Sequence, residues 1–142
     1  SAQLSGRCQR IEDPFGAAIE WVLDVAHNPD AARELAKALA TLPPRARVIG
    51  VVGILADKNA DEIVGELTAV IDAWVLCALD GARGRTAEQL RAELSPPVSV
   101  IGMTPSVAEA CVLARAIAGS NDRIVVLGSF HVVGPALDWL GV

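Results

Sequence analysis

The chain has 142 residues, the size of one ordinary domain, and 52% of them are apolar while 20% are charged. This composition can bury a sizeable core and argues against intrinsic disorder. The 12 lysines and arginines are outnumbered by 17 aspartates and glutamates, giving a net charge of −5, and aromatic residues make up only 4%. Such a chain lacks the basic patches and stacking rings of a nucleic-acid surface, so we expect no nucleic-acid partner.

Membrane and metal classes are disfavoured as well. No apolar run reaches the roughly 18 to 20 residues that a membrane span needs, and no secretion signal is present, so we expect a cytoplasmic protein with no membrane partner. The three cysteines, Cys8, Cys77 and Cys111, are odd in number and form no CxxC pair. Neither a disulfide framework nor a zinc site fits this pattern, and we expect free thiols and no metal ligands.

Apolar runs alternate with segments of helical periodicity along the whole chain. Strands are predicted at residues 4–11, 19–25, 48–55, 73–78, 98–101 and 124–127. Helices are predicted at residues 30–42, 61–71, 86–94, 105–118 and 132–140. The first strand alternates in polarity, so we expect it at an edge of the sheet and antiparallel. The pattern predicts one domain over residues 1–142 with a Rossmann-like α/β fold, in which a mostly parallel sheet of about six strands carries helices on both faces.

Three polar turns, at residues 24–29, 53–58 and 128–134, follow predicted strands. In open parallel sheets, ligands bind beyond the carboxyl ends of the strands, where these turns lie. Each candidate also has a structural interpretation. Asp24 is either an acceptor for a ribose hydroxyl or a metal-bound water, or a residue that ties the loop; His27 is either catalytic or an ordinary turn residue. Lys58 either holds an anion or is solvated, and Ser129 either marks an anion site at a helix start or is a simple N-cap.

Phosphate-binding loops are missing from the sequence. Neither GxGxxG after a first strand nor GxxxxGK[ST] occurs anywhere in the chain. The basic glycine loop at residues 81–85 could contact a ligand, but such loops are common. The chain therefore lacks a phosphate cradle of its own.

Four motifs resemble a known family when they are taken together and in order. They are Gly6-Arg7-Cys8-Gln9, Leu23-Asp24-Val25-Ala26-His27-Asn28-Pro29, Asp57-Lys58 and Gly128-Ser129-Phe130-His131. With the stretch at residues 83–90, they look like the C-terminal domain of the bifunctional dihydrofolate synthase/folylpolyglutamate synthases of the Mur ligase superfamily. The resemblance extends from Gly6 to about residue 140.

The resemblance implies an ATP-dependent ligase that adds L-glutamate to dihydropteroate and to reduced folates such as tetrahydrofolate through an acyl phosphate. In this family, an N-terminal domain supplies the P-loop, the Mg²⁺ ligands and most of the pterin site. That domain is absent from this chain, so the chain alone is expected to be inactive and to need its own N-terminal domain as a partner. We expect a monomer.

Site residues follow from the same resemblance. Arg7 matches the arginine that reaches the ATP phosphates, and Asp24 the aspartate that contacts the nucleotide at its ribose. His27, Lys58 and Ser129 match positions around the incoming glutamate, with Lys58 and Ser129 holding its carboxylates and His27 orienting it as the catalytic candidate. The interval between Arg7 and Asp24 is longer than the family's usual one, which predicts a longer hairpin around residues 13–16.

Two alternatives stay open at this point. Ligases of peptidoglycan synthesis share the Asp…His turn, but they would carry a different amino-acid signature, such as Asp-Asn-Pro-Arg, which this sequence lacks. A catalytically silent Rossmann-type module that binds a nucleotide or a protein is the alternative from another class. A P-loop domain upstream in the parent reading frame would argue against the silent module.

Overall fold

The computed structural model describes residues 7–96 and 98–142. Within these residues, six strands form one sheet in the order β1-β2-β6-β3-β4-β5. Only the β1–β2 pair is antiparallel, and the other neighbours run parallel. The strands are β1 (Gln9–Glu12), β2 (Glu20–Asp24), β3 (Val48–Val52), β4 (Ala73–Cys77), β5 (Val100–Thr104) and β6 (Arg123–Leu127). The predicted α/β fold with a mostly parallel sheet is confirmed.

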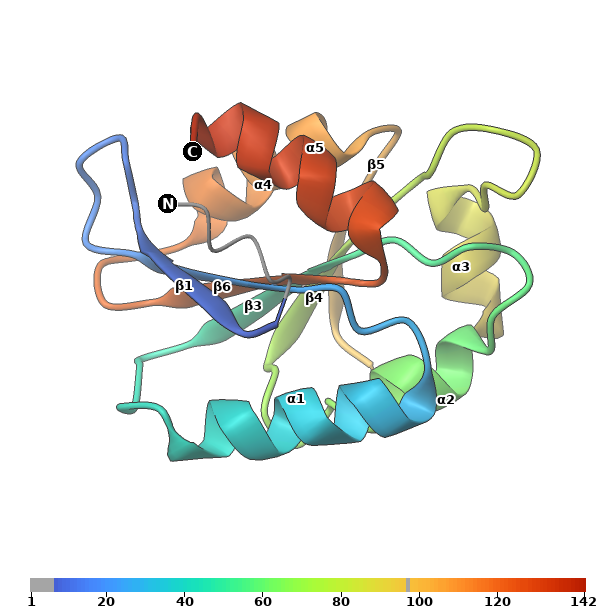
Figure 1. Ribbon diagram of the computed structural model, residues 1–142, viewed down its shortest axis with the longest axis horizontal. Helices are drawn as coiled ribbons and strands as arrows, with labels where there is room; N and C mark the ends of the chain where they lie inside the picture. Colours follow the sequence, from blue (N-terminus) through green and yellow to red (C-terminus); the bar gives the residue numbers. More distant parts are fainter. Residues whose placement is uncertain (1–6, 97) are drawn as a thin grey trace.

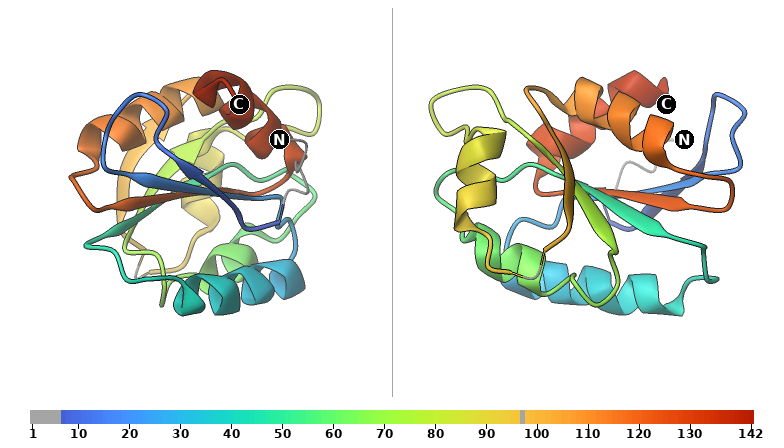
Figure 2. Two further views of the ribbon diagram at one scale, coloured as in Figure 1. Left: turned by 60° about the vertical axis from the view of Figure 1, so that its left-hand side comes forward. Right: turned by 180° about the vertical axis from the view of Figure 1, so that it is seen from behind.

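Helices cover both faces of this sheet. They are α1 (Pro29–Thr41), α2 (Ala60–Gly65), α3 (Ala87–Glu93), α4 (Val107–Ile117) and α5 (Phe130–Leu140). Figure 1 shows α1 and α2 below the sheet and α4 and α5 above it, and Figure 2 shows the same layers from two other directions. The buried residues of α3 join those of α1 and α2, so these three helices cover one face and α4 and α5 cover the other.

Burial explains why these residues form strands. Every residue of β2, β4 and β6 is buried, as expected of strands covered on both sides. The outer strands β1 and β5 instead alternate in exposure, as expected at an edge of the sheet. Two tryptophans fill opposite layers: Trp21 packs with α4 and α5, and Trp74 packs with α1, α2 and α3. The buried strands therefore contribute apolar side chains to the hydrophobic layers on both faces of the sheet.

Side chains cap the starts of the helices. The Asn28 side chain accepts the Ala31 N–H at the start of α1, and Thr86 and Gln89 form a capping box at the start of α3. Among the helices in the described part of the chain, none is long and apolar enough to cross a membrane.

Three predicted boundaries within the described residues differ from the structure by three residues or more. Helix α2 ends at Gly65 instead of residue 71, because the chain tightens into i→i−3 turns in which the Thr68 hydroxyl donates to the Gly65 carbonyl. Strand β3 ends at Val52, three residues early, since residues 53–55 turn out of the sheet. Strand β5 runs to Thr104, not residue 101. Residues 4–6 of the predicted first strand lie outside the described residues.

Buried charges gather at the amino ends of the strands. Glu20 and Arg123, each 3% exposed, form an ion pair of 2.7 Å between Oε1 and Nε, and the half-exposed Arg10 binds the other Glu20 oxygen. Arg123 also donates to the Pro43 carbonyl. This cluster satisfies its own charges, which is the condition for burying them.

A second buried carboxylate fixes the β1–β2 hairpin. Asp13 accepts the N–H groups of Phe15 and Ala17, the Trp21 indole N–H and the guanidinium of Arg115 on α4. Burial by itself would raise the pKa of Asp13, but these donors hold that pKa down at about 2. The predicted long hairpin is therefore an ordered loop tied to α4.

Candidate functional site

Three turns meet at the carboxyl edge of the sheet because the strands that precede them end level with one another. Asp24 at the end of β2 and Val52 at the end of β3 are both paired with Leu127, the last residue of β6. The turns after these strands carry His27, Lys58 and Ser129, while Asp24 is the last residue of β2. Open parallel sheets bind their ligands at this edge.

A cavity of about 240 Å³ lies between the turn after β2, the start of β1 and helix α1. Its polar lining includes Arg7, Asp24, His27 and Asn28, and its apolar wall includes Leu35. Three of the five predicted site residues, Arg7, Asp24 and His27, are thus brought together in one hollow. A cavity with an apolar wall and a few convergent polar groups is typical of a small-molecule site.

Asp24 is the buried carboxylate of this cavity, with 6% of its surface exposed. Its Oδ1 accepts the Ala26 N–H at 2.8 Å, and its Oδ2 accepts the Cys8 N–H at 2.9 Å. Burial raises the pKa of Asp24, while these N–H groups and the charge of Arg7 act against that rise. The loop-tying role is therefore real. Because a carboxylate has about four acceptor positions, two remain for ligand hydroxyls.

His27 is exposed on the rim of the cavity, and its Nδ1 lies 3.1 Å from the Val25 carbonyl oxygen. With the proton placed on Nδ1, that nitrogen donates to the carbonyl and Nε2 keeps its lone pair for a ligand. The local backbone thereby selects which ring nitrogen faces outward.

The turn after β6 is compressed against the turn after β3. Gly128 has a φ of +130°, and a Cβ at this position would collide with the Gly53 carbonyl group, so only glycine fits. Ser129 follows, 6% exposed, and its Oγ accepts the His131 N–H at 3.0 Å as the N-cap of α5. Within the described ranges, its hydroxyl proton has no acceptor, so the hydroxyl can still donate to a ligand.

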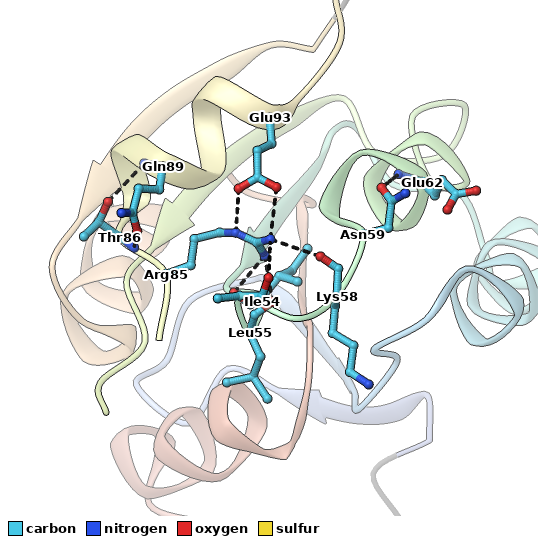
Figure 3. A network of polar contacts seen from close by, with 10 residues as sticks. Ile54, Leu55, Lys58, Asn59, Glu62, Arg85, Thr86, Gln89 and Glu93 are labelled. Atoms are coloured by element: carbon cyan, nitrogen blue, oxygen red, sulfur yellow. Dashed lines mark hydrogen bonds and ion pairs between the residues drawn. The ribbon is translucent and has the colours of Figure 1, made fainter. Parts of the chain in front are cut away.

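Lys58 is partly exposed on the loop after β3. Among residues 7–96 and 98–142, no carboxylate lies within ion-pairing distance of its ammonium. In Figure 3, this ammonium points away from the polar network that holds the loop. Lys58 and Ser129 lie outside the lining of the cavity that contains Asp24, on the two neighbouring turns.

Comparisons with known proteins decide the family. The model of the family described as "Mur ligase, glutamate ligase domain" matches residues 6–130. The chain belongs to this family. The resemblance seen in the sequence motifs is confirmed.

Individual relatives agree with this assignment. The chain is 38% identical over 138 residues to the dihydrofolate synthase/folylpolyglutamate synthase of Escherichia coli, and this match covers 97% of the chain and 31% of the relative. It is similar to a structure of E. coli FolC in complex with DHPP and ADP, with a TM-score of 0.85 and 36% identity, covering 99% of the chain and 32% of that protein. It is also similar to a bifunctional folylpolyglutamate synthase/dihydrofolate synthase with Mn, AMPPNP and L-glutamate bound, with a TM-score of 0.82 and 34% identity, covering 100% of the chain and 33% of that protein. The chain spans about a third of each.

One structurally important residue of this glutamate ligase domain, Arg85, was not identified from the sequence. Arg85, 5% exposed, donates hydrogen bonds to backbone carbonyls of the loop that carries Lys58 and forms an ion pair with Glu93. The basic glycine loop was a candidate ligand contact, whereas Arg85 is directed into the protein. The available signal was an arginine directly before a capping box with an acid eight residues later.

Residues 7–96 and 98–142 of this glutamate ligase domain contain no group of three or more His, Cys, Asp or Glu side chains that could hold a metal ion. The cysteines there are free: burial raises the pKa of Cys77 and of Cys111 to about 12, so both thiols stay protonated.

Proposed function

We propose that this chain is the C-terminal domain, formed by residues 1–142, of a cytoplasmic, monomeric ligase that uses ATP to add L-glutamate to dihydropteroate and to reduced folates. The observation that carries the proposal is the level ending of β2, β3 and β6, which places Asp24, Lys58 and Ser129 on adjacent turns. The names of the relatives and the ADP, DHPP, AMPPNP and L-glutamate in the structures of FolC-type enzymes support it.

The cavity beside α1 takes the nucleotide in this proposal. The two acceptor positions left on Asp24 suit the hydroxyls of a ribose, since each hydroxyl donates one hydrogen bond. Arg7, on the wall of the same cavity, carries a planar fork of donors that matches phosphoryl oxygens. The aliphatic wall that includes Leu35 gives a base an apolar surface to lie on.

Glutamate lies across the turns after β3 and β6. Lys58 offers an ammonium that pairs with no carboxylate in the described part of the chain, and Ser129 offers a hydroxyl donor at the start of α5. A lysine and a helix start together suit a carboxylate. His27, with Nε2 free to accept, orients the amine of glutamate from the neighbouring turn.

The proposed reaction proceeds in two steps. A folate carboxylate oxygen attacks the γ-phosphorus of ATP, which releases ADP and leaves an acyl phosphate. The glutamate amine then attacks the acyl carbon, an amide bond forms, and phosphate leaves with the bonding electron pair and takes up the proton that the amine loses. Bound Mg²⁺ would offset phosphate charge, and we propose that the N-terminal domain supplies its ligands together with the P-loop. This chain binds and orients ATP and glutamate until the domains close around them.

Steady-state kinetics of the full-length ligase test the proposal. Removing a charge-assisted contact costs about 1.5 to 3 kcal/mol, so Arg7→Ala and Asp24→Ala should raise the KM for ATP about tenfold or more. Lys58→Ala and Ser129→Ala should raise the KM for L-glutamate instead. The opposite assignment of effects would overturn the proposed roles.

The chain alone provides the negative control. It should release no phosphate from ATP with glutamate and folate present, and activity should need the N-terminal domain. Ligation by the chain alone would contradict the proposal. A full-length protein with no phosphate release would favour the silent module, and a preference for an amino acid other than L-glutamate would favour another Mur-type ligase.

A further inference from the structure

Arg85 lies at the centre of a polar network that Figure 3 shows from close by. Its Nη1 donates to the carbonyls of Ile54 at 3.1 Å and Leu55 at 2.8 Å. Its Nη2 donates to the carbonyls of Ala56 at 3.2 Å and Lys58 at 3.0 Å. One side chain thus binds four of the five carbonyls between residues 54 and 58.

These carbonyls need such a partner because β3 has already ended. Beyond Val52, the chain leaves the sheet, so its backbone groups lose the ladder that satisfied them. Ile54 and Leu55 are buried, where an unpaired carbonyl would be costly, and apart from Arg85 the described residues offer a backbone partner only to the Leu55 carbonyl, the Lys58 N–H at 3.1 Å. Only a guanidinium has five donors in a flat fork; a lysine has three on a single atom.

Glu93 completes the network. Its carboxylate binds Arg85 at 2.8 Å through Nε and 3.0 Å through Nη2, which balances the buried charge. Glu93 is the last residue of α3, and the capping box at Thr86 starts that helix directly after Arg85. The guanidinium is therefore held from two sides before it binds the loop.

We propose that Arg85 is a positioning residue for the glutamate site. By fixing the carbonyl of Lys58 and those of Ile54, Leu55 and Ala56, it sets the direction in which the Lys58 ammonium leaves the loop. Figure 3 shows this ammonium directed away from Arg85. The inference rests on the proposed role of Lys58 in binding glutamate.

The test uses Arg85→Lys in the full-length ligase, which keeps the charge but loses the fork. We expect the KM for glutamate to rise about tenfold while the KM for ATP changes little. Amide hydrogen exchange at residues 54–59 should accelerate. Glu93→Gln keeps a hydrogen-bond acceptor on an exposed side chain, so it should give the same changes, but smaller ones, if Arg85→Lys fails to fold.

Arg83→Lys is the matched control. Arg83 lies two residues away on the same loop and pairs with Asp57 at the surface, where both side chains are more than half exposed. Its variant should leave the KM for glutamate and the exchange at residues 54–59 unchanged. An effect as large as that of Arg85→Lys would overturn the proposal.

A double-mutant cycle separates positioning from general loss of structure. Once Lys58→Ala has removed the ammonium, Arg85→Lys should cost little more in the KM for glutamate, so the two effects should not add. Full additivity, or a fall in kcat with an unchanged KM for glutamate, would overturn the inference. A different result would separate the two proposals: Lys58→Ala leaves the KM for glutamate unchanged, while Arg85→Lys still speeds exchange at residues 54–59. In that case Lys58 does not bind glutamate, and Arg85 cannot position the glutamate site through it. The conclusion that Arg85 fixes the loop would still hold.

Discussion

The two ends of the sheet both bury polar groups, but they use them differently. At the amino ends, Glu20 is bound by two arginines, and Asp13 receives donors from the backbone, an indole and a guanidinium. At the carboxyl ends, Asp24 is bound by two backbone N–H groups and keeps two acceptor positions, and Ser129 keeps its hydroxyl proton.

This difference distinguishes polar groups that stabilise the fold from polar groups that are able to bind a ligand. A group whose partners are all inside the protein stabilises the fold, and a group with bonding capacity left over can bind something else. Substitutions at the amino ends should therefore change stability without affecting substrate requirements. Those at the carboxyl ends should change substrate requirements and have smaller effects on stability.

Arg123→Ala should give the largest loss. It leaves Glu20 buried with only the half-exposed Arg10 as a partner, and breaking a buried pair typically costs about 3 to 5 kcal/mol. Urea unfolding of the chain followed by circular dichroism measures this loss. Arg10→Ala is the matched control and should cost less, because the buried Arg123 remains on Glu20. An equal or larger loss for Arg10→Ala would contradict this account of the amino end.

Asp13→Asn should reduce the pH dependence of stability in acid. The folded pKa of Asp13 is about 2, below its ordinary value of 3.8, so the unfolded chain binds the proton more tightly. The stabilisation is complete above about pH 4 and is lost as the pH falls toward 2. Unfolding free energies of the wild type should therefore fall more steeply over this range than those of Asp13→Asn. Parallel curves would show that this carboxylate does not supply the effect.

Ser129→Ala should lower stability by about 1 kcal/mol, the usual cost of losing an N-cap. Ser106 caps α4 in the same way, with its Oγ accepting the Glu109 N–H at 3.1 Å. Ser106→Ala should thus match the stability loss measured by urea unfolding. In the full-length ligase, however, only Ser129→Ala should raise the KM for glutamate. Equal effects of the two variants on the KM for glutamate would show that Ser129 acts only as an N-cap.

Lys58→Ala should have the smallest effect on stability, within about 0.5 kcal/mol, since its ammonium makes no ion pair in the described part of the chain. Lys37, which pairs with Glu34 on the exposed surface of α1, supplies the comparison. Thermal unfolding of both variants should stay close to the wild type. Only Lys58→Ala should change the glutamate requirement, and a large stability loss would show that Lys58 belongs to the supporting set.

Much of this arrangement could be predicted from sequence. Apolar runs predicted β2, β3, β4 and β6, because strands buried on both faces need apolar residues at most positions. The meeting of the turns at one edge followed from the parallel sheet. The sheet order did not, because periodicity says nothing about which strands pair. The length of α2 was overestimated because Leu67 and Ile71 are buried at helical spacing while lying in turns.

The sequence could not predict the contacts that hold the loops of the site in place. Arg85 binds carbonyls that lie 27 to 31 residues earlier in the chain, and backbone carbonyls have no signature in a sequence. Side chains at strand ends can be predicted as candidates from residue type. What holds their loops in place depends on contacts that only the fold brings about.

The central position of β6 has a consequence for how the chain folds. Strand β6 lies between β2 and β3, and within residues 7–96 and 98–142 it is the only strand that joins the β1–β2 hairpin to the β3–β4–β5 group. Until Arg123–Leu127 has been synthesised, a nascent chain holds two sheet fragments with unpaired edges, which are prone to pair wrongly. Such long-range closure makes folding slow compared with helical proteins. We therefore expect the sheet to close only after β6 has left the ribosome, so that a chaperone acting earlier would bind two separate sheet fragments.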